Sequence, residues 1–287
     1  MALTGVPIAQ CNDERTFKQF EPKASISYDL SSDASVYASY GKGFKSGGFN
    51  PIGSRQALIA AAVGAGLPAS SVYVQDGFEK ETSTSYEIGA KARLFDRRLS
   101  INAAIFKTDI TGAQQFEFYP SAGLQTTVGI DKVALKGFDL DFNAQLPWGM
   151  QIFGGYGYTD GKVKAFAGNP AFVGNRSPGA FKYTLSIGAS QTIDLGGDFS
   201  LVPRIEYNRF GTIWWDAANT PGTRRDPLDL VKARLTLKSG KGFEISAYGD
   251  NLTNEKYFQE VVPLLGFFTV NYRGPTRSYG IEGRLTF

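Results

Sequence analysis

Two pairs of carboxylates are the residues of this sequence whose spacing could support acid and base catalysis. Glu79 and Glu81 form one pair, and Asp139 and Asp141 form the other. A spacing of two residues places both members of a pair on one face of a strand, where a water-filled interior would also carry charge. The sequence contains no histidine, so a Ser-His-Asp triad and a Cys-His pair are excluded. We expect a protein that is not an enzyme.

The sequence also has few residues that could bind a metal ion or a cofactor. Cys11 is the single cysteine, which excludes an internal disulfide and a multi-cysteine metal site. The glycines at positions 41, 43, 47 and 48 resemble a phosphate loop by number alone, because no helix pattern follows them. The 30 basic and 27 acidic residues are spread along the chain, so no basic stripe marks nucleic-acid binding. We expect no metal, no cofactor and no nucleic-acid partner.

The elements that must position these side chains are strands, because apolar and polar residues alternate along most of the chain. In residues 181–190 and 231–238, for example, every second residue is apolar, and about eleven such strands can be counted. Lys232 and Arg234 lie in mid-strand and would be costly against lipid, so the polar face must be the interior. The pattern predicts an all-β fold, a portion of an antiparallel transmembrane β-barrel.

The connections between these strands alternate in length. Short polar turns are predicted near residues 31–32, 96–97, 147–149, 196–197 and 239–242, and long segments near 43–81, 112–124, 161–179, 211–227 and 251–277. Short periplasmic turns at one rim and long extracellular loops at the other are typical of outer-membrane barrels. The Ala-rich stretch 57–69 is too short to span a bilayer, so we interpret it as a short helix within a loop.

Aromatic residues and one glycine refine this prediction. In residues 133–142 the apolar positions change parity around Gly137, which predicts a β-bulge or a bend. Aromatic rings near strand ends suit the headgroup level of a membrane. The residues assigned to such a girdle are Tyr28, Tyr40, Phe95, Tyr119, Trp148, Tyr156, Tyr158, Tyr207, Trp214, Trp215 and Tyr279.

Four segments resemble one known family. Residues 37–49 (YASYGKGFKSGGF), 81–94 (ETSTSYEIGAKARL) and 249–258 (GDNLTNEKYF), together with the strand at 278–287, are similar in sequence and order to motifs of TonB-dependent outer-membrane receptors. The resemblance implies half of a 22-stranded barrel. It also implies an active transporter that uses energy from TonB to import a scarce ligand: most readily a ferric siderophore, otherwise cobalamin or an oligosaccharide.

The chain departs from the family pattern, since we find about half of the strands, no plug domain, no TonB box and no signal peptide. We expect residues 1–20 to be a poorly defined N-terminal loop segment and residues 21–287 to be the C-terminal part of the barrel, present as a fragment. The partners implied are outer-membrane lipid and lipopolysaccharide, TonB through the missing N-terminal region, and a small-molecule ligand. The barrel-assembly machinery would read the last strand through Tyr279, Ile281, Leu285 and Phe287.

Ligand contacts are expected from the long loops. Aromatic rings and guanidinium groups suit aryl or carboxylate-bearing ligands, and the candidates are Tyr73, Phe78, Trp214, Trp215, Arg224 and Arg225. The alternative for Trp214 and Trp215 is girdle or loop packing, and the alternative for Arg224 and Arg225 is a solvated or lipopolysaccharide-facing pair. Two other functions stay open from the sequence: a small stand-alone porin or adhesin barrel, and a soluble β-sandwich that binds carbohydrate.

Overall fold

The computed structural model describes residues 14–119, 122–264 and 268–286; Cys11 and Phe287 lie outside them. Eleven strands follow one another through a single antiparallel path. They are β1 (Lys23–Ser31), β2 (Ala34–Lys45), β5 (Glu81–Leu94), β6 (Leu99–Tyr119), β7 (Leu124–Gln145), β8 (Met150–Ala165), β9 (Tyr183–Gln191), β11 (Phe199–Phe210), β14 (Leu228–Ser239), β15 (Phe243–Asp250) and β18 (Ser278–Leu285). The predicted all-β fold of about eleven strands is confirmed.

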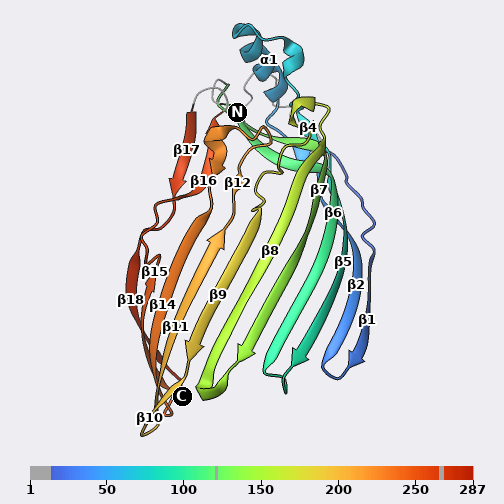
Figure 1. The fold of residues 1–287 in the computed structure, drawn as a ribbon. Helices are drawn as coiled ribbons and strands as arrows, with labels where there is room; N and C mark the ends of the chain where they lie inside the picture. Colours follow the sequence, from blue (N-terminus) through green and yellow to red (C-terminus); the bar gives the residue numbers. More distant parts are fainter. Residues whose placement is uncertain (1–13, 120–121, 265–267, 287) are drawn as a thin grey trace.

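The sheet is strongly curved and open (Figure 1). Each strand of the path pairs with the strand before it and the strand after it, whereas β1 and β18 each have one neighbour among the described residues. The remaining strands are short or branch off the path: β3 (Gly48–Phe49), β4 (Gly77–Phe78), β10 (Ile193–Gly196), β12 (Ile213–Trp214), β13 (Arg224–Arg225), β16 (Phe258–Leu264) and β17 (Phe268–Arg273).

All five predicted short turns lie at one end of the sheet, and the long connections lie at the other (Figure 1). The predicted long connection at residues 112–124 is wrong. Residues 112–119 belong to β6 and residues from 124 onward belong to β7, and these strands pair with each other beyond the rest of the wall. Gln114 and Gln115 lie within the expected long segment, but both backbones are in the ladder. The expected loop 251–277 likewise contains the hairpin β16–β17.

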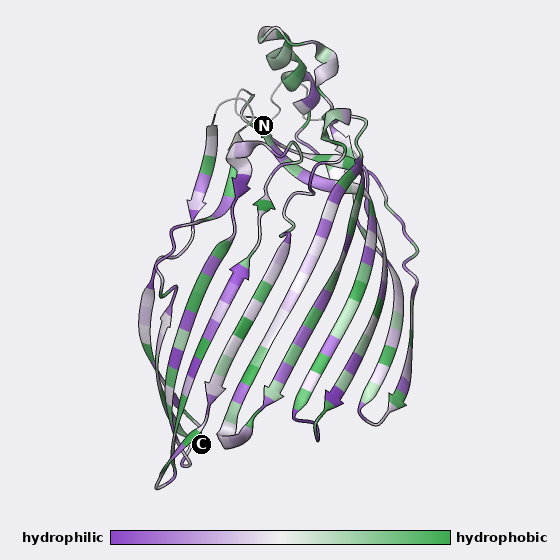
Figure 2. Cartoon of the chain, viewed as in Figure 1, coloured by the Kyte–Doolittle hydropathy of each residue, from purple (hydrophilic) through white to green (hydrophobic). Residues whose placement is uncertain are grey.

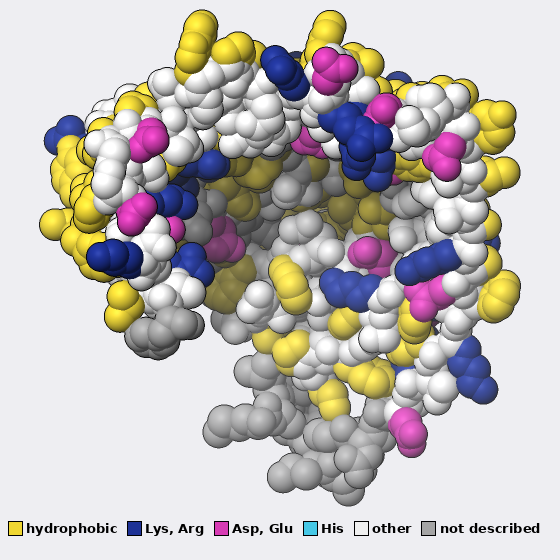
Figure 3. Space-filling model, turned by 90° about the horizontal axis from the view of Figure 1, so that it is seen from below, with side chains coloured by type: hydrophobic (Ala, Val, Ile, Leu, Met, Phe, Trp, Pro, Cys, Tyr) yellow, Lys and Arg dark blue, Asp and Glu magenta, His cyan; other side chains and the backbone are white. Residues whose placement is uncertain are grey.

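The two faces of the wall differ in chemistry, as the alternation predicted. Hydrophobic side chains on one face are exposed, for example Ile26, Ile88, Ile105, Ile205 and Ile281. The other face carries Asp139, Asp141, Arg204 and Arg234, which share the opposite parity of their strands. Hydrophobic and hydrophilic bands alternate along the strands in Figure 2, and Figure 3 shows hydrophobic side chains around the outer rim of a hollow with charged groups inside.

Five tyrosines form a row on the apolar outer face, towards the long-loop end. We call Tyr40, Tyr86, Tyr156, Tyr158 and Tyr183 the tyrosine row. The ring centroids of Tyr40 and Tyr86 are 5.3 Å apart, and those of Tyr156 and Tyr183 are 6.2 Å apart. Tyr40, Tyr156 and Tyr158 were predicted for the girdle, and Tyr86 and Tyr183 add to it, because amphipathic rings belong at the membrane boundary. At the opposite end, Trp148 is 86% exposed.

The predicted bulge at Gly137 is wrong. Gly137 lies opposite both Phe106 and Thr159 in unbroken ladders, and the register shift falls instead between Lys132 and Val133. A Cβ at Gly137 would collide with the backbone carbonyl of Tyr158 and lie 2.8 Å from the Phe106 ring, so the glycine permits the close approach of β8 and makes room for that ring. The apolar positions change parity because Val133 and Leu135 point inward, where they join a cluster with loop residues.

A roof covers the long-loop end. We use this name for residues 46–80 and the tip of the β6–β7 hairpin, residues 113–130. The tip crosses toward the far side of the curved sheet, where Phe118 of β6 pairs in parallel with Leu264 of β16 (Figure 1). Gly112 marks the start of the tip with φ +68°, a backbone conformation that glycine adopts at little cost.

The loop between β2 and β5 lies on this tip and contains η2 (Ala69–Ser71) and α1 (Ser54–Gly64). Alanine-rich sequence favours the helix, and Asp76 accepts a hydrogen bond from the Arg55 amide at its first turn. No helix among the described residues is long and apolar enough to cross a membrane. Asn50 ties the loop to the tip: its amide nitrogen donates to the Thr127 carbonyl at 2.9 Å, and its amide oxygen accepts from the Thr127 N–H at 2.6 Å.

The buried hydrophobic side chains that the structure describes all lie at this end of the molecule. They are Leu58, Val74, Leu124, Val128, Ile130, Val133, Val163, Phe166, Ile213, Ala217, Leu228 and Val261. Two clusters result, one around Leu58 and Val74 and one around Ile130 and Val163. The wall itself has no such core among the described residues.

Candidate functional site

The loop between β11 and β14 brings four of the six predicted ligand contacts together. Trp214 of β12 lies opposite Arg224 of β13, and Ile213 lies opposite Arg225. This pairing continues the register of the β11–β14 ladder above the wall. The sequence prediction therefore placed these residues correctly in one loop, although it could not show which side chains meet.

Asp216 holds the tip of this loop in shape. It is buried, and its carboxylate accepts hydrogen bonds from the Thr220 hydroxyl at 2.5 Å and from the Thr223 hydroxyl at 2.6 Å. Thr223 ends the short 3-10 helix η6 (Pro221–Thr223) and accepts a hydrogen bond from the Trp215 amide at 3.0 Å. Trp215 is thus fixed by backbone contacts beside the two arginines.

Arg225 lies among three aromatic rings, which we call the Arg225 cage. Its guanidinium carbon is 5.4 Å from the centroid of Phe181 and 5.9 Å from the centroids of both Trp215 and Tyr257. Cations are attracted to aromatic faces at these distances. Desolvation by the surrounding rings lowers the pKa of the Arg225 guanidinium, and the neighbouring Tyr257 acts in the opposite direction.

One edge of the Arg225 guanidinium has no hydrogen-bond acceptor. Nη1 donates to the Phe258 carbonyl at 3.1 Å, whereas Nε and Nη2 are buried and have no partner in the described structure. These two N–H groups form the fork that matches both oxygens of a carboxylate. A buried donor without an acceptor costs free energy, so this edge is a candidate site for an anionic group of a ligand.

Arg224 differs from its neighbour. It is exposed, it forms an ion pair with Asp226 at 2.6 Å, and it lies over the Trp214 ring at 5.8 Å. An exposed pair of this kind contributes little binding energy. Arg224 fits the solvated-pair alternative, whereas ligand contact by Arg225 stays a prediction.

Tyr73 and Phe78 lie in the roof and are not part of the cage. The Tyr73 hydroxyl donates to the Glu117 carboxylate at 2.8 Å, and its ring packs edge-on against Phe166. Phe78 lies in β4 opposite Gly48. The six predicted contacts therefore do not form one cluster.

A buried carboxylate holds Tyr73 in place. Glu117 accepts hydrogen bonds from the hydroxyl groups of both Tyr73 and Tyr119. Burial raises the pKa of Glu117, and the two tyrosine hydrogen bonds oppose this effect only in part. Tyr119 was assigned to the aromatic girdle, but it belongs to this cluster because the tip of β6 leaves the wall.

No sequence pattern marked Phe181, Tyr257 or Glu117 as site residues. Phe181 was counted in the alternation of a strand, and Tyr257 was part of a family motif. Phe181 and Tyr257 reach the cage from loops that are distant in sequence, and Glu117 reaches Tyr73 from the tip of β6, so local spacing holds no information on these contacts.

The two carboxylate pairs lie apart from the cage. Asp139 and Asp141 share the inner face of β7, as predicted. Glu79 forms an ion pair with Arg15 at 2.5 Å, whereas Glu81 accepts from the Gln114 amide. No group of three or more acidic, histidine or cysteine residues in the described part of the chain is placed to hold a metal ion.

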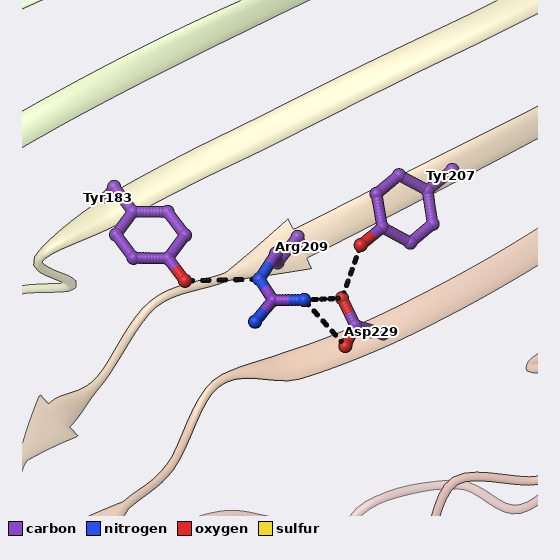
Figure 4. Close-up of polar contacts among 4 residues, drawn as sticks. All are labelled: Tyr183, Tyr207, Arg209 and Asp229. Atoms are coloured by element: carbon purple, nitrogen blue, oxygen red, sulfur yellow. Dashed lines mark hydrogen bonds and ion pairs between the residues drawn. The ribbon is translucent and has the colours of Figure 1, made fainter.

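A charged network on the outer face marks the upper limit of the apolar wall. Arg209 of β11 donates hydrogen bonds to both carboxylate oxygens of Asp229 at 3.0 Å and to the Tyr183 hydroxyl at 3.1 Å. The Tyr207 hydroxyl also donates to the Asp229 carboxylate (Figure 4). Its members share the outward parity of Ile187 and Ile205. Tyr207 therefore fits the predicted girdle.

The proposed assembly signal lies on β18. Tyr279, Ile281 and Leu285 share one face and are exposed, with Ile281 82% exposed. Phe287 lies outside the described residues. The three described side chains continue the apolar outer face of β15, where Gly249, Ala247 and Phe243 lie opposite them.

Comparison with known proteins agrees with this architecture. Residues 9–252 match the family model for TonB dependent receptor-like β-barrels. The ferric yersiniabactin uptake receptor FyuA from Yersinia pestis aligns with a TM-score of 0.71 at 23% identity, over 92% of this chain and 37% of that chain. The ferric citrate transporter FecA in its unliganded form gives 0.66 at 17% identity, over 93% and 38%.

Two curated relatives match about half of the chain. A ferric-pyoverdine 358 receptor from Pseudomonas putida is 28% identical over 52% of this chain, and the probable TonB-dependent receptor BfrD from Bordetella pertussis is 27% identical over 60%. The matched parts span 16% and 21% of those proteins. The family match covers most of the sheet, and the chain therefore belongs to the TonB-dependent receptor β-barrel family.

Proposed function

We propose that this chain forms part of the barrel wall of an outer-membrane receptor that imports a ferric siderophore with energy from TonB. The observation that carries the proposal is the wall itself, whose exposed isoleucines face outward and whose inner face turns charged residues such as Asp139 and Arg234 to the hollow. Such a surface is stable where lipid covers one side. The siderophore class is supported by relatives named as receptors for ferric-pyoverdine, metal-pseudopaline and catecholate siderophores.

Within this function, the Arg225 cage supplies a contact for an anionic group of the ferric complex. The Nε and Nη2 edge of Arg225 lacks an acceptor, and the three rings offer stacking surface. Because the edge is buried, at least one ring must move aside before a ligand carboxylate can reach it. Trp215 is one of these rings, so ligand binding at Arg225 changes its fluorescence.

The test uses the natural polypeptide that carries this chain, purified from outer membranes in detergent. Ferric complexes of catecholate, hydroxamate and carboxylate siderophores are titrated while tryptophan fluorescence is followed. Arg225→Gln is expected to weaken binding of the recognised complex about 10- to 100-fold, the range for a charge-assisted hydrogen bond.

Arg224→Gln is the matched control, because Arg224 is exposed and paired with Asp226; it is expected to change affinity less than about twofold. Failure of folded protein to bind any ferric complex would contradict the receptor function. Equal affinity of Arg225→Gln and the unaltered protein would contradict the cage alone.

A further inference from the structure

Five lysines lie on the outer side of β6, β7 and β8, directly above the tyrosine row. We call Lys107, Lys132, Lys136, Lys162 and Lys164 the lysine patch. Lys107 lies opposite both Tyr86 and Lys136 in the ladder, and Lys162 lies opposite Ala134.

The parity of each strand places these side chains outside. Lys107 shares its face with exposed Ile105, and Lys136 shares its face with exposed Phe138 and Leu140. Lys162 follows Tyr158 of the tyrosine row by four residues along β8, which returns it to the same face. Lys132 and Lys164 are both exposed at the register shift where β7 and β8 leave the wall.

Most of this charge has no counterpart in the protein. Lys107 pairs with Asp109 at 2.7 Å, and Asp160 pairs with Arg176 at 3.6 Å. No ion pair of the described residues includes Lys132, Lys136, Lys162 or Lys164. Lys136 lies between Lys107 on one side and Asp160 on the other in the ladder. Asp109 and Asp160 offset part of the charge of the five lysines and Arg176, and the remaining excess of positive charge favours an anion here.

On β11, at the same boundary of the same face, positive charge is neutralised, since Arg209 has a bidentate partner in Asp229 (Figure 4). β6, β7 and β8 therefore carry an excess of positive charge that β11 does not.

We propose that the lysine patch binds the phosphate groups of an anionic glycolipid in the outer leaflet of the membrane. The inference rests on the membrane placement in the proposed function. Tyrosine rings belong at headgroup level, so ammonium groups immediately above them reach the phosphates. Strands about 4.8 Å apart present the lysines at a spacing that several phosphates of one lipid can match, and the acyl chains then lie along Phe138 and Leu140.

The experiment compares lipid binding by matched variants of the natural polypeptide in detergent. The protein is stripped of lipid and titrated with phosphorylated lipopolysaccharide, with the same lipid after phosphatase treatment, and with inorganic phosphate. The patch variant carries Lys132→Gln, Lys136→Gln, Lys162→Gln and Lys164→Gln. The control carries Lys91→Gln, Lys182→Gln, Lys232→Gln and Lys238→Gln, four lysines on the inner parity of their strands.

We expect the patch variant to lose at least about tenfold in affinity for the phosphorylated lipid, whereas the control keeps it and both retain binding of the ferric complex. Equal lipid affinity in the patch variant and the unaltered protein overturns the proposal. Equal affinity for the phosphatase-treated and the phosphorylated lipid also overturns it. Saturation of the patch by inorganic phosphate alone would show a site for free anions and not for the lipid. If the fourfold variant does not fold, the double variant Lys136→Gln and Lys162→Gln decides between these outcomes.

Discussion

The wall and the roof of this molecule are stabilised in different ways. The wall consists of long antiparallel ladders whose side chains are exposed on the outside and face a hollow on the inside. The roof contains buried hydrophobic clusters and buried polar groups with their hydrogen bonds satisfied, such as Asn50 and Glu117. The roof is thus organised like a water-soluble domain, whereas the wall depends on lipid as its second layer.

The largest effect is expected from a charge placed on the outside of the wall. Ile105→Arg on β6 should lower the free energy of unfolding in lipid vesicles by about 2–4 kcal/mol, because the site faces lipid. Urea titration of protein refolded into vesicles measures this change. Asn102→Arg, on the inner face of the same strand, is the control with an expected cost below about 1 kcal/mol. Equal costs would contradict the assignment of the two faces.

Loss of the Asn50 link should affect the roof alone. Asn50→Ala leaves the Thr127 amide and carbonyl without their partner in a buried position, at a cost of about 1–3 kcal/mol. Hydrogen exchange of the Thr127 amide should become faster while exchange in β5 and β11 stays unchanged. Gln125→Ala, an exposed residue of the same tip, should leave both rates alone. Faster exchange throughout the wall would show that the two regions unfold together.

A smaller effect is expected from trimming one methyl group in the roof. Ile130→Val removes a methylene from a buried position, and such changes cost about 1 kcal/mol. Thermal unfolding followed by tryptophan fluorescence reports it through Trp214 and Trp215. Ile193→Val in β10 at the short-turn end removes the same group from an exposed position and should have almost no effect. A larger loss at Ile193 would reverse the comparison.

The smallest effect concerns pH. Burial raises the pKa of Glu117 above its ordinary value, so the folded roof binds this proton more tightly than the unfolded chain does. Roof stability should therefore fall as pH rises from the ordinary glutamate pKa through the raised one. Hydrogen exchange of the roof at several pH values tests this, and Glu117→Gln should remove the dependence. Glu79→Gln, at an exposed ion pair, should keep it.

The wall was largely predictable from the sequence, and the roof was not. Alternation within residues 181–190 is a local signal, since each side chain alternates between lipid and interior. The same rule misread Gly137, because it assumes that apolar residues always face outward, whereas Val133 and Leu135 face inward under the loops. Loop chemistry pointed to Arg225 and Trp215, but Phe181 and Tyr257 approach through tertiary contacts that no local pattern encodes.

The left-handed backbone at Gly112 gives the hairpin tip the geometry of a pivoted arm. From Gly112 to the end of β6 the arm is about 23 Å long, at roughly 3.3 Å per residue. A rotation of about 10° at the pivot would therefore move its end by about 4 Å, enough to separate Phe118 from Leu264. Because β7 pairs with this arm along its whole length and Asn50 binds it at Thr127, release of the parallel bridge to β16 requires the hairpin tip and the loop on it to move as one body.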